Sequence, residues 1–199
     1  FTLEVAGNTT ISNDITKYGT GALYFQGDDD YLLTKELHEW GDEDFTIEMW
    51  WYPTSTSRQA LFHGSWGQDW SIGIDYNGGG TTTLGIWASS SGTNWDLIDA
   101  DPGGDGIGSE TINQNQWNHI AYTRNGTTWT SWVNGVKDVE ITSLGGTIAN
   151  TPAKMAIGAW WQLSSMSSVH GYIDDFRITK GIARYTANFT PPTKALPKR

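Results

Sequence analysis

Apolar and polar residues alternate with a period of two along most of the chain, while helical spacing is nearly missing. This pattern is typical of half-buried β-strands. The clearest example is "FTIEMWWY" at residues 45–52, which places four large side chains on one face of an extended segment: Phe45, Ile47, Met49 and Trp51. The opposite face also carries aromatic residues, so we expect this strand to lie in the centre of its sheet.

Short turn sequences divide the chain into hairpins. Asn-Gly pairs at 125–126 and 134–135 tolerate the positive φ angles of tight hairpin turns. Both fall between Trp117 and Ile141, and they predict a meander of three strands. Residues 88–116 are rich in Ser, Gly, Asn and Asp, and we expect long surface loops there. Many short strands at this spacing predict an all-β fold, a two-sheet antiparallel β-sandwich.

The composition narrows the class of protein. The 199 residues include no cysteine, so the fold depends on packing, with an oxygen-ligated metal as an option. A formal net charge of −10 argues against nucleic acid as a partner, because binding to phosphates requires a basic surface. No apolar run is long enough to span a bilayer, and we expect no membrane insertion. The 12 Trp offer flat apolar faces that serve as core or as surfaces on which sugar rings stack.

Four motifs occur in a familiar order: "YGTGALYFQGDDDYLL", "FTIEMWWYPT", "WNHIAYTRNGTTWTSWVNGV" and "GYIDDFRITKGIARYT". Together they resemble the laminin-G-like, concanavalin A-like lectin/glucanase jelly-roll domains, from about Tyr18 to Pro192. The resemblance implies two curved antiparallel sheets of six or seven strands each. We therefore expect one domain over residues 1–192 and a C-terminal tail over 193–199. The ending is similar to copies of this domain in tailed-phage virion proteins.

The resemblance also implies a structural calcium ion at the sandwich edge. In many members the ion is held by the turn that matches "GDDDY" and by the late strand that matches "IDD". This nominates Asp30 with Asp174 or Asp175, and the backbone carbonyl of Gly27. Oxygen ligands of this kind suit calcium. The alternative is that the turn is only solvated and Asp174 pairs with a backbone amide or an arginine.

Charge inside the last predicted strand needs partners, because its neighbours are apolar. Strict alternation places Asp174, Phe176 and Ile178 on one face, and Asp175 and Arg177 on the other. We expect Arg177 to pair with Asp175, which leaves Asp174 for the acidic turn's metal or for backbone donors. The expected role of this charge is structural.

The tryptophans divide into two sets. Trp51 and Trp70 share strand faces with isoleucines and Trp117 opens a strand, so we expect these three in the core. Others lie in a Gly-rich turn, a polar loop or an adjacent pair that must point to opposite faces. An exposed indole is best explained by a partner. The predicted stacking residues are Trp66, Trp87, Trp95, Trp160 and Trp161. For each of them, the alternative is that the indole anchors a loop.

We expect no catalysis. Glucanases of the resembled fold carry carboxylates at alternate positions of one strand, as in Glu-x-Asp-x-x-Glu, and the sequence contains no such strand. Glu48 stands alone between Thr46 and Trp50. The four histidines lack the paired spacing of a metal site.

The sequence therefore predicts a non-catalytic carbohydrate-binding or adhesion domain that binds a glycan or polysaccharide on an extracellular or virion surface. Two alternatives stay open. One is a purely structural virion or fibre subunit, whose exposed aromatics contact neighbouring subunits. The other is a carbohydrate-binding module of a secreted polysaccharide-degrading enzyme.

Overall fold

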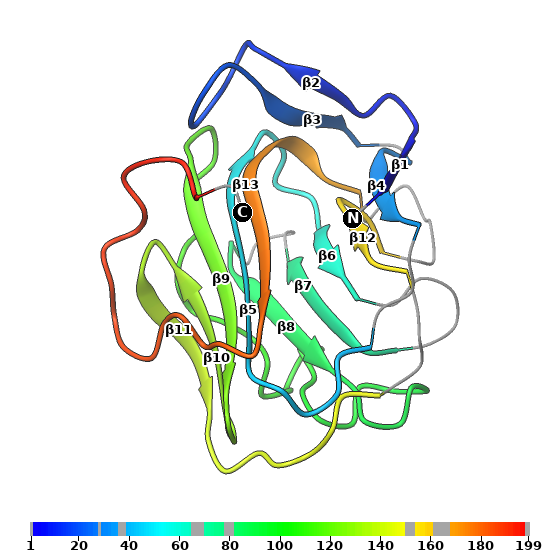
Figure 1. Cartoon of the computed structure of the whole chain (residues 1–199), viewed down its shortest axis with the longest axis vertical. Helices are drawn as coiled ribbons and strands as arrows, with labels where there is room; N and C mark the ends of the chain where they lie inside the picture. The colour runs from blue at the N-terminus through cyan, green and yellow to red at the C-terminus, as the bar shows by residue number, and fades with distance from the viewer. Residues whose placement is uncertain are drawn as a thin grey trace.

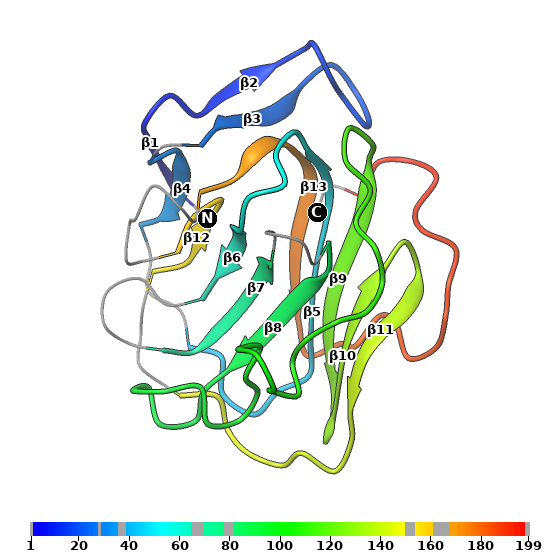
Figure 2. The same ribbon diagram turned by 180° about the vertical axis from the view of Figure 1, so that it is seen from behind.

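The structure is a computed structural model, and it describes residues 2–27, 29–35, 39–64, 70–77, 82–149, 154–160 and 168–197. Two antiparallel sheets lie face to face (Figures 1 and 2), and the described residues contain no helix. The predicted all-β sandwich is confirmed. No described helix is long and apolar enough to cross a membrane.

Thirteen strands of the described chain form the two sheets. In spatial order, the six-stranded sheet consists of β1 (Leu3–Ala6), β4 (Tyr31–Thr34), β12 (Ala156–Ile157), β6 (Gln59–His63), β7 (Ile72–Tyr76) and β8 (Leu84–Ala88). The seven-stranded sheet consists, in the same way, of β11 (Val136–Ile141), β10 (Thr128–Val133), β9 (Asn118–Asn125), β5 (Phe45–Pro53), β13 (His170–Lys180), β3 (Ala22–Gln26) and β2 (Thr10–Ser12).

The hydrophobic core lies between the sheets. Strand β5 lies in the middle of its sheet, between β9 and β13, as its two apolar faces predict. All four residues predicted for one face are at most 1% exposed: Phe45, Ile47, Met49 and Trp51. The ring of Trp51 lies 5.3 Å from that of Tyr76 on the opposite sheet, so the two layers meet through aromatic contacts.

The predicted meander is present as β9, β10 and β11. Asn134 and Gly135 have φ angles of 52° and 80°, which suit a tight turn between right-handedly twisted strands. Residues between β8 and β9 form long loops, tied to β8 by isolated bridges at Ile98 and Ile107. These loops lie where the Ser, Gly, Asn and Asp content predicts them.

A β-bulge interrupts the alternation expected along β13. The register with β5 shifts between Asp174 and Arg177, and Asp175 takes a φ of 50°. The one extra residue turns Phe176 into the core and leaves Arg177 opposite Glu48 on the outer face. The predicted faces are therefore wrong, and so is the predicted ion pair, because Arg177 pairs with Glu48 rather than with Asp175.

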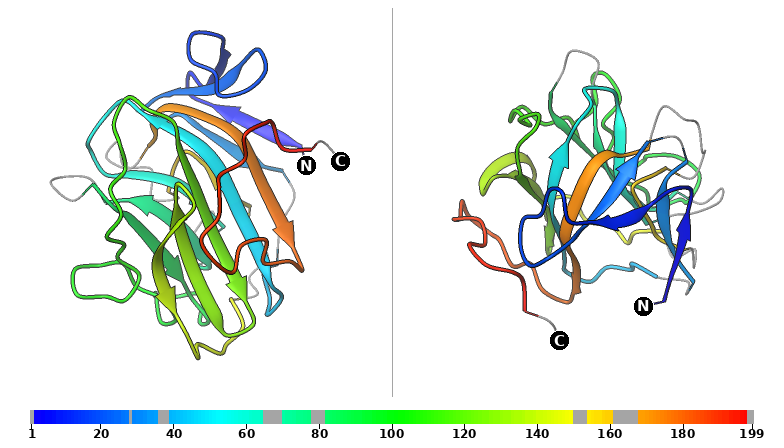
Figure 3. Two further views of the ribbon diagram at one scale, coloured as in Figure 1. Left: turned by 90° about the vertical axis from the view of Figure 1, so that its left-hand side faces the viewer. Right: turned by 90° about the horizontal axis from the view of Figure 1, so that it is seen from above.

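The C-terminal segment, residues 181–197, crosses the outer face of the seven-stranded sheet (Figure 3, left). The rings of Tyr185 and Phe189 stack 3.6 Å apart, and Phe189 lies 5.6 Å from His119 of β9. The backbone amide of Leu196 donates a hydrogen bond to Asp175. The boundary at residue 192 stays a prediction, and the described segment is held to the sheet well past Phe189.

Candidate functional site

A row of three residues crosses neighbouring strands on the outer face of the six-stranded sheet. His63 of β6 lies opposite Gly73 of β7, and Gly73 lies opposite Trp87 of β8. Phe62 and Ile86, which precede His63 and Trp87, point into the core, so the side chains of His63 and Trp87 point away from it. Strand pairing therefore places a histidine and an indole on either side of a residue without a side chain.

Gly73 makes room for the imidazole. A Cβ atom at this position would lie 2.6 Å from Cε1 of His63, closer than side chains approach one another. Glycine within a strand often marks a place where another group must come close to the backbone. The ring of His63 can therefore lie across β7.

Three further indoles gather over this row. The ring of Trp95 lies 4.7 Å from Trp70 and 5.3 Å from Trp87, and it lies 6.2 Å from His63. The ring of Trp160 stacks on His63 at 5.8 Å with an interplanar angle of 29°. We call these five residues the aromatic cluster: His63, Trp70, Trp87, Trp95 and Trp160.

The cluster contains both buried and partly exposed side chains. His63 and Trp87 are 1% and 2% exposed, whereas Trp70, Trp95 and Trp160 are half-buried. The prediction of an exposed indole at Trp87 is therefore wrong, because Trp95 covers it. Trp70 is not in the core between the sheets, because it precedes β7 and contacts Trp95 instead.

The other predicted stacking residues, Trp66 and Trp161, lie outside the described residues. Two of the five, Trp95 and Trp160, are thus brought together with part of their surface exposed. Trp117, which we expected in the core, is half-buried and contacts Tyr52 at 5.6 Å.

Hydrogen bonds fix the loop that carries Trp95. Asp96 Oδ1 accepts hydrogen bonds from the Ser90 amide at 2.9 Å and from the Ser89 hydroxyl at 3.1 Å. The Ser90 hydroxyl donates to Oδ2 at 2.5 Å. Burial opposes ionisation of Asp96, but these hydrogen bonds outweigh it and hold its pKa well below the usual range. An ionised Asp96 therefore anchors the turn that sets the position of the Trp95 ring.

Polar groups lie beside the indoles. Nε2 of His63 is 2.7 Å from Oδ1 of buried Asp75, whose other oxygen accepts from Nη2 of Arg58 at 3.2 Å. The Arg58 side chain is 41% exposed, and its guanidinium lies 5.7 Å from the centre of the Trp87 ring. Within the described part of the chain, neither His63 Nδ1 nor Trp87 Nε1 has a hydrogen-bond partner. The cluster thus combines apolar ring faces with hydrogen-bonding groups.

A second polar group lies on the outer face of the other sheet, under the C-terminal segment. Glu48 is fully buried, and its Oε1 accepts from Arg177 Nε at 2.9 Å and Nη2 at 2.5 Å. The Tyr185 hydroxyl donates to Oε2 at 2.6 Å, and His119 Nε2 lies 3.4 Å from the same oxygen. Burial opposes ionisation, but these neighbours outweigh it and lower the pKa of Glu48. The carboxylate joins β5 to β13 and to the C-terminal segment, which is a structural role.

The residues predicted to bind calcium accept hydrogen bonds from backbone amides in separate networks. The carboxylate of Asp30 accepts from the amides of Asn8 at 2.5 Å and Gln26 at 2.7 Å. The Asp174 carboxylate accepts from the amides of Lys17 and Tyr18, both at 3.0 Å. These carboxylates therefore fix the first part of the chain against the sheet edge.

The remaining predicted ligands are also engaged. Asp175 accepts from the Leu196 amide at 2.7 Å, and the carbonyl of Gly27 accepts from the Asp30 amide at 3.2 Å. No group of three or more His, Cys, Asp or Glu side chains that could hold a metal ion occurs among the described residues, to which Asp28 does not belong. The arrangement fits carboxylates that bind backbone amides better than it fits calcium ligands.

We therefore expect the melting temperature to be the same in EDTA as in excess calcium. Asp30→Asn should lower it equally in both, because the substitution weakens hydrogen bonds from two backbone amides. Thermal unfolding followed by circular dichroism checks both statements. A melting temperature that rises with calcium in the wild type, but not in Asp30→Asn, would support the calcium site that the sequence predicts.

Comparison with known proteins defines the family. Residues 26–183 match the family model of the concanavalin A-like lectin/glucanases superfamily, and the chain belongs to this family. No protein with a curated description matches the sequence significantly.

Solved structures share the fold at low sequence identity. Domain 4 of AbnA, an extracellular GH43 arabinanase from Geobacillus stearothermophilus in complex with arabinotriose, is 18% identical with a TM-score of 0.62, over 90% of this chain and 82% of that one. Domains LG4-5 of the mouse laminin α1 chain are 16% identical with a TM-score of 0.59, and the match covers 79% of this chain and 40% of that one. The ligand-binding domain of botulinum neurotoxin serotype D, in complex with N-acetylneuraminic acid, is 11% identical with a TM-score of 0.56. The match covers 95% of this chain and 43% of that one. At these identities the likeness establishes the fold alone.

Proposed function

We propose that the chain is a non-catalytic carbohydrate-binding domain whose binding site is the aromatic cluster. The observation that carries this proposal is a group of three half-buried indoles on a sheet face: Trp95 and Trp160 contact His63, and Trp70 contacts Trp95. Rings held by a rigid sheet and a fixed loop lose little conformational entropy on binding, which favours stacking on a flat apolar ligand face.

The polar groups of the cluster suit sugar hydroxyls. Arg58 offers guanidinium donors at a partly exposed position, and Asp75 orients both Arg58 and His63. Such a combination of apolar ring faces and a few fixed polar groups is typical of small-molecule sites. Asp75 and Asp96 lie beside the cluster in a chain whose formal net charge is −10, so the site should favour neutral sugars over anionic ones.

Two kinds of relatives support a carbohydrate ligand. The arabinanase domain was solved with arabinotriose and the neurotoxin domain with N-acetylneuraminic acid. The arabinanase is extracellular, and its domain is covered over 82% of its length. We therefore propose an extracellular role, either as a module of a secreted polysaccharide-degrading enzyme or as an adhesion domain on a cell or virion surface.

Catalysis is not part of the proposal. Glu48 is fully buried and engaged by Arg177 and Tyr185, so it has no access to a substrate. Asp75 is paired with Arg58 and His63. Glycoside hydrolysis needs two carboxyl groups that flank one bond. In the described part of the chain, the two carboxylates beside the cluster, Asp75 and Asp96, are both engaged in hydrogen bonds with their neighbours.

A glycan array that includes plant and microbial polysaccharides tests the proposal. We expect binding to one or a few neutral glycans, including arabinose-containing ones, and weaker binding to sulfated or uronic-acid chains. Binding should be insensitive to moderate salt, because stacking and neutral hydrogen bonds dominate. A blank array, or binding to acidic chains alone that disappears with salt, would contradict the proposal.

A further inference from the structure

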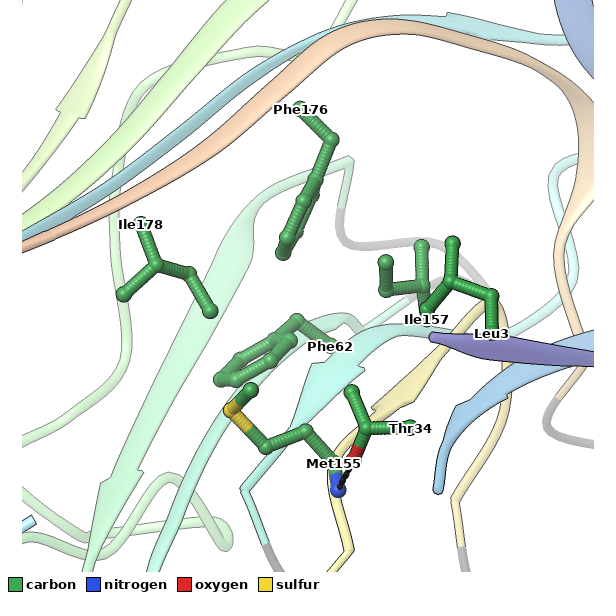
Figure 4. A pocket seen from close by; sticks show the side chains of 7 residues that line it. All are labelled: Leu3, Thr34, Phe62, Met155, Ile157, Phe176 and Ile178. Carbon is green, nitrogen blue, oxygen red and sulfur yellow. Dashed lines mark hydrogen bonds between the residues drawn. The ribbon is translucent and has the colours of Figure 1, made fainter. Parts of the chain in front are cut away.

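An apolar pocket lies between the two sheets (Figure 4). None of its lining residues belongs to the aromatic cluster. Its volume is about 290 Å³. The six-stranded sheet and its adjoining residues contribute five lining side chains, and β13 contributes two across the gap. The lining residues are Leu3, Thr34, Phe62, Met155, Ile157, Phe176 and Ile178.

The bulge in β13 supplies one wall of the pocket. Without the one extra residue between Asp174 and Arg177, Phe176 would share a face with Asp174 and point outward. In the structure it points from β13 toward Phe62, and the two ring centres lie 5.7 Å apart. Bulges that redirect a side chain often occur beside functional sites.

The chemistry of the lining restricts the ligand to hydrocarbon. Six of the seven residues are apolar, and the one hydroxyl, of Thr34, accepts a hydrogen bond from the Met155 amide at 2.8 Å. No charged side chain is among the described residues that line the pocket. Water inside it would find few hydrogen-bond partners, so an apolar group that replaces water gains hydrophobic free energy.

The size and opening of the pocket define the ligand further. An engineered cavity of about 150 Å³ lined by aliphatic and aromatic residues binds benzene. The present pocket is about twice that volume, and Leu3 at its edge is 43% exposed, which leaves a way in from solvent. We propose that the pocket is a second binding site, which takes a compact apolar ligand the size of two fused aromatic rings.

Naphthalene is the probe for this site, and methionine methyl NMR is the readout. In protein labelled with ¹³C at the methionine methyl groups, naphthalene should shift the Met155 signal in a saturable way. Met49 is fully buried elsewhere in the core, so its signal should stay in place. No saturable shift at Met155, or shifts of equal size at Met49, would overturn the proposal.

Two variants test whether the ligand occupies this volume. Ile178→Phe adds bulk to the pocket, and Leu3→Trp places an indole at its edge, in an edge strand where a larger side chain is tolerated. Each should weaken naphthalene binding at least tenfold. The control is Ile11→Phe, at a position 76% exposed on β2 outside the pocket, which should bind as the wild type does.

Leu3→Trp keeps the test valid if Ile178→Phe fails to fold. Wild-type affinity in a folded Leu3→Trp or Ile178→Phe variant would overturn the proposal, as would an equal loss in Ile11→Phe. Glycan binding should be unchanged in all three variants, so this inference and the proposed carbohydrate function can fail separately.

Discussion

Replacing Arg177 with methionine is expected to lower the free energy of unfolding by about 3–5 kcal/mol, because it leaves a buried carboxylate without its main partner. Glu48 is 0% exposed, and Arg177 donates two hydrogen bonds to its Oε1 atom. Tyr185 and His119 stay close to Oε2 without the fixed positive charge of a guanidinium. Arg184 Nε lies 3.9 Å from Oε1, which is too far for a hydrogen bond. Urea denaturation at pH 7 measures the loss.

Lys137→Met is the matched control. Lys137 forms an ion pair with Glu140 on the surface, with both side chains 36% exposed, and such pairs contribute about 0–1 kcal/mol. If Arg177→Met costs no more than Lys137→Met, the buried ion pair of Glu48 and Arg177 does not stabilise the fold.

The pH dependence of stability gives a second readout of the same group. The pKa of Glu48 is lowered in the folded protein from its ordinary value of 4.5. The stability that ionised Glu48 contributes is therefore complete when the pH is above 4.5. It is lost as the pH falls from 4.5 through the folded pKa, because the unfolded state then binds a proton more readily. Glu48→Gln should therefore be less stable at pH 7 and lose less stability on acidification than the wild type.

The largest functional effect is expected in the aromatic cluster. Trp95→Ala and Trp160→Ala should each weaken binding to the best glycan of the array by about 2 kcal/mol, or about thirtyfold, which is the scale of a central indole in an interface. Trp117→Ala is the control, because Trp117 is also half-buried but contacts Tyr52 outside the cluster. Isothermal titration calorimetry of variants with native circular dichroism spectra makes the comparison. Equal affinity in all three variants would show that the aromatic cluster is not the binding site.

Local patterns are sufficient to predict the layers of the fold. The alternation at 45–52 specifies both the inner face of β5 and its central place, since apolar side chains on both faces need cover on both sides. The Asn-Gly turn at 134–135 likewise specifies the β10–β11 hairpin. Each of these features depends on residues adjacent in sequence.

The composition of the site depends on residues that are distant in sequence. Trp95 and Trp160 can be predicted individually from their unsuitability for the core, but nothing in the sequence joins them to His63. The register of β6, β7 and β8 brings His63 and Trp87 to either side of Gly73. Pairing register is a tertiary property, and a shift of one residue would turn the side chains of His63 and Trp87 inward.

The error in β13 has a similar cause. Strict alternation predicts an Arg177–Asp175 pair, but a bulge adds one residue to β13 only and reverses the faces that follow it. The partner of Arg177 is Glu48, which is 129 residues away in sequence. Local spacing gives no information about a contact of this range.

The central claim, that sugar binds on the outer face of the six-stranded sheet, is tested most directly by ¹H–¹⁵N NMR of the indole groups during titration with the best oligosaccharide from the array. The account predicts saturable shifts for the Trp95 and Trp160 signals. It predicts unchanged signals for Trp117 and for Trp132, which is 0% exposed on β10 of the seven-stranded sheet. Saturable shifts confined to Trp117 or Trp132, with Trp95 and Trp160 unmoved, would contradict it.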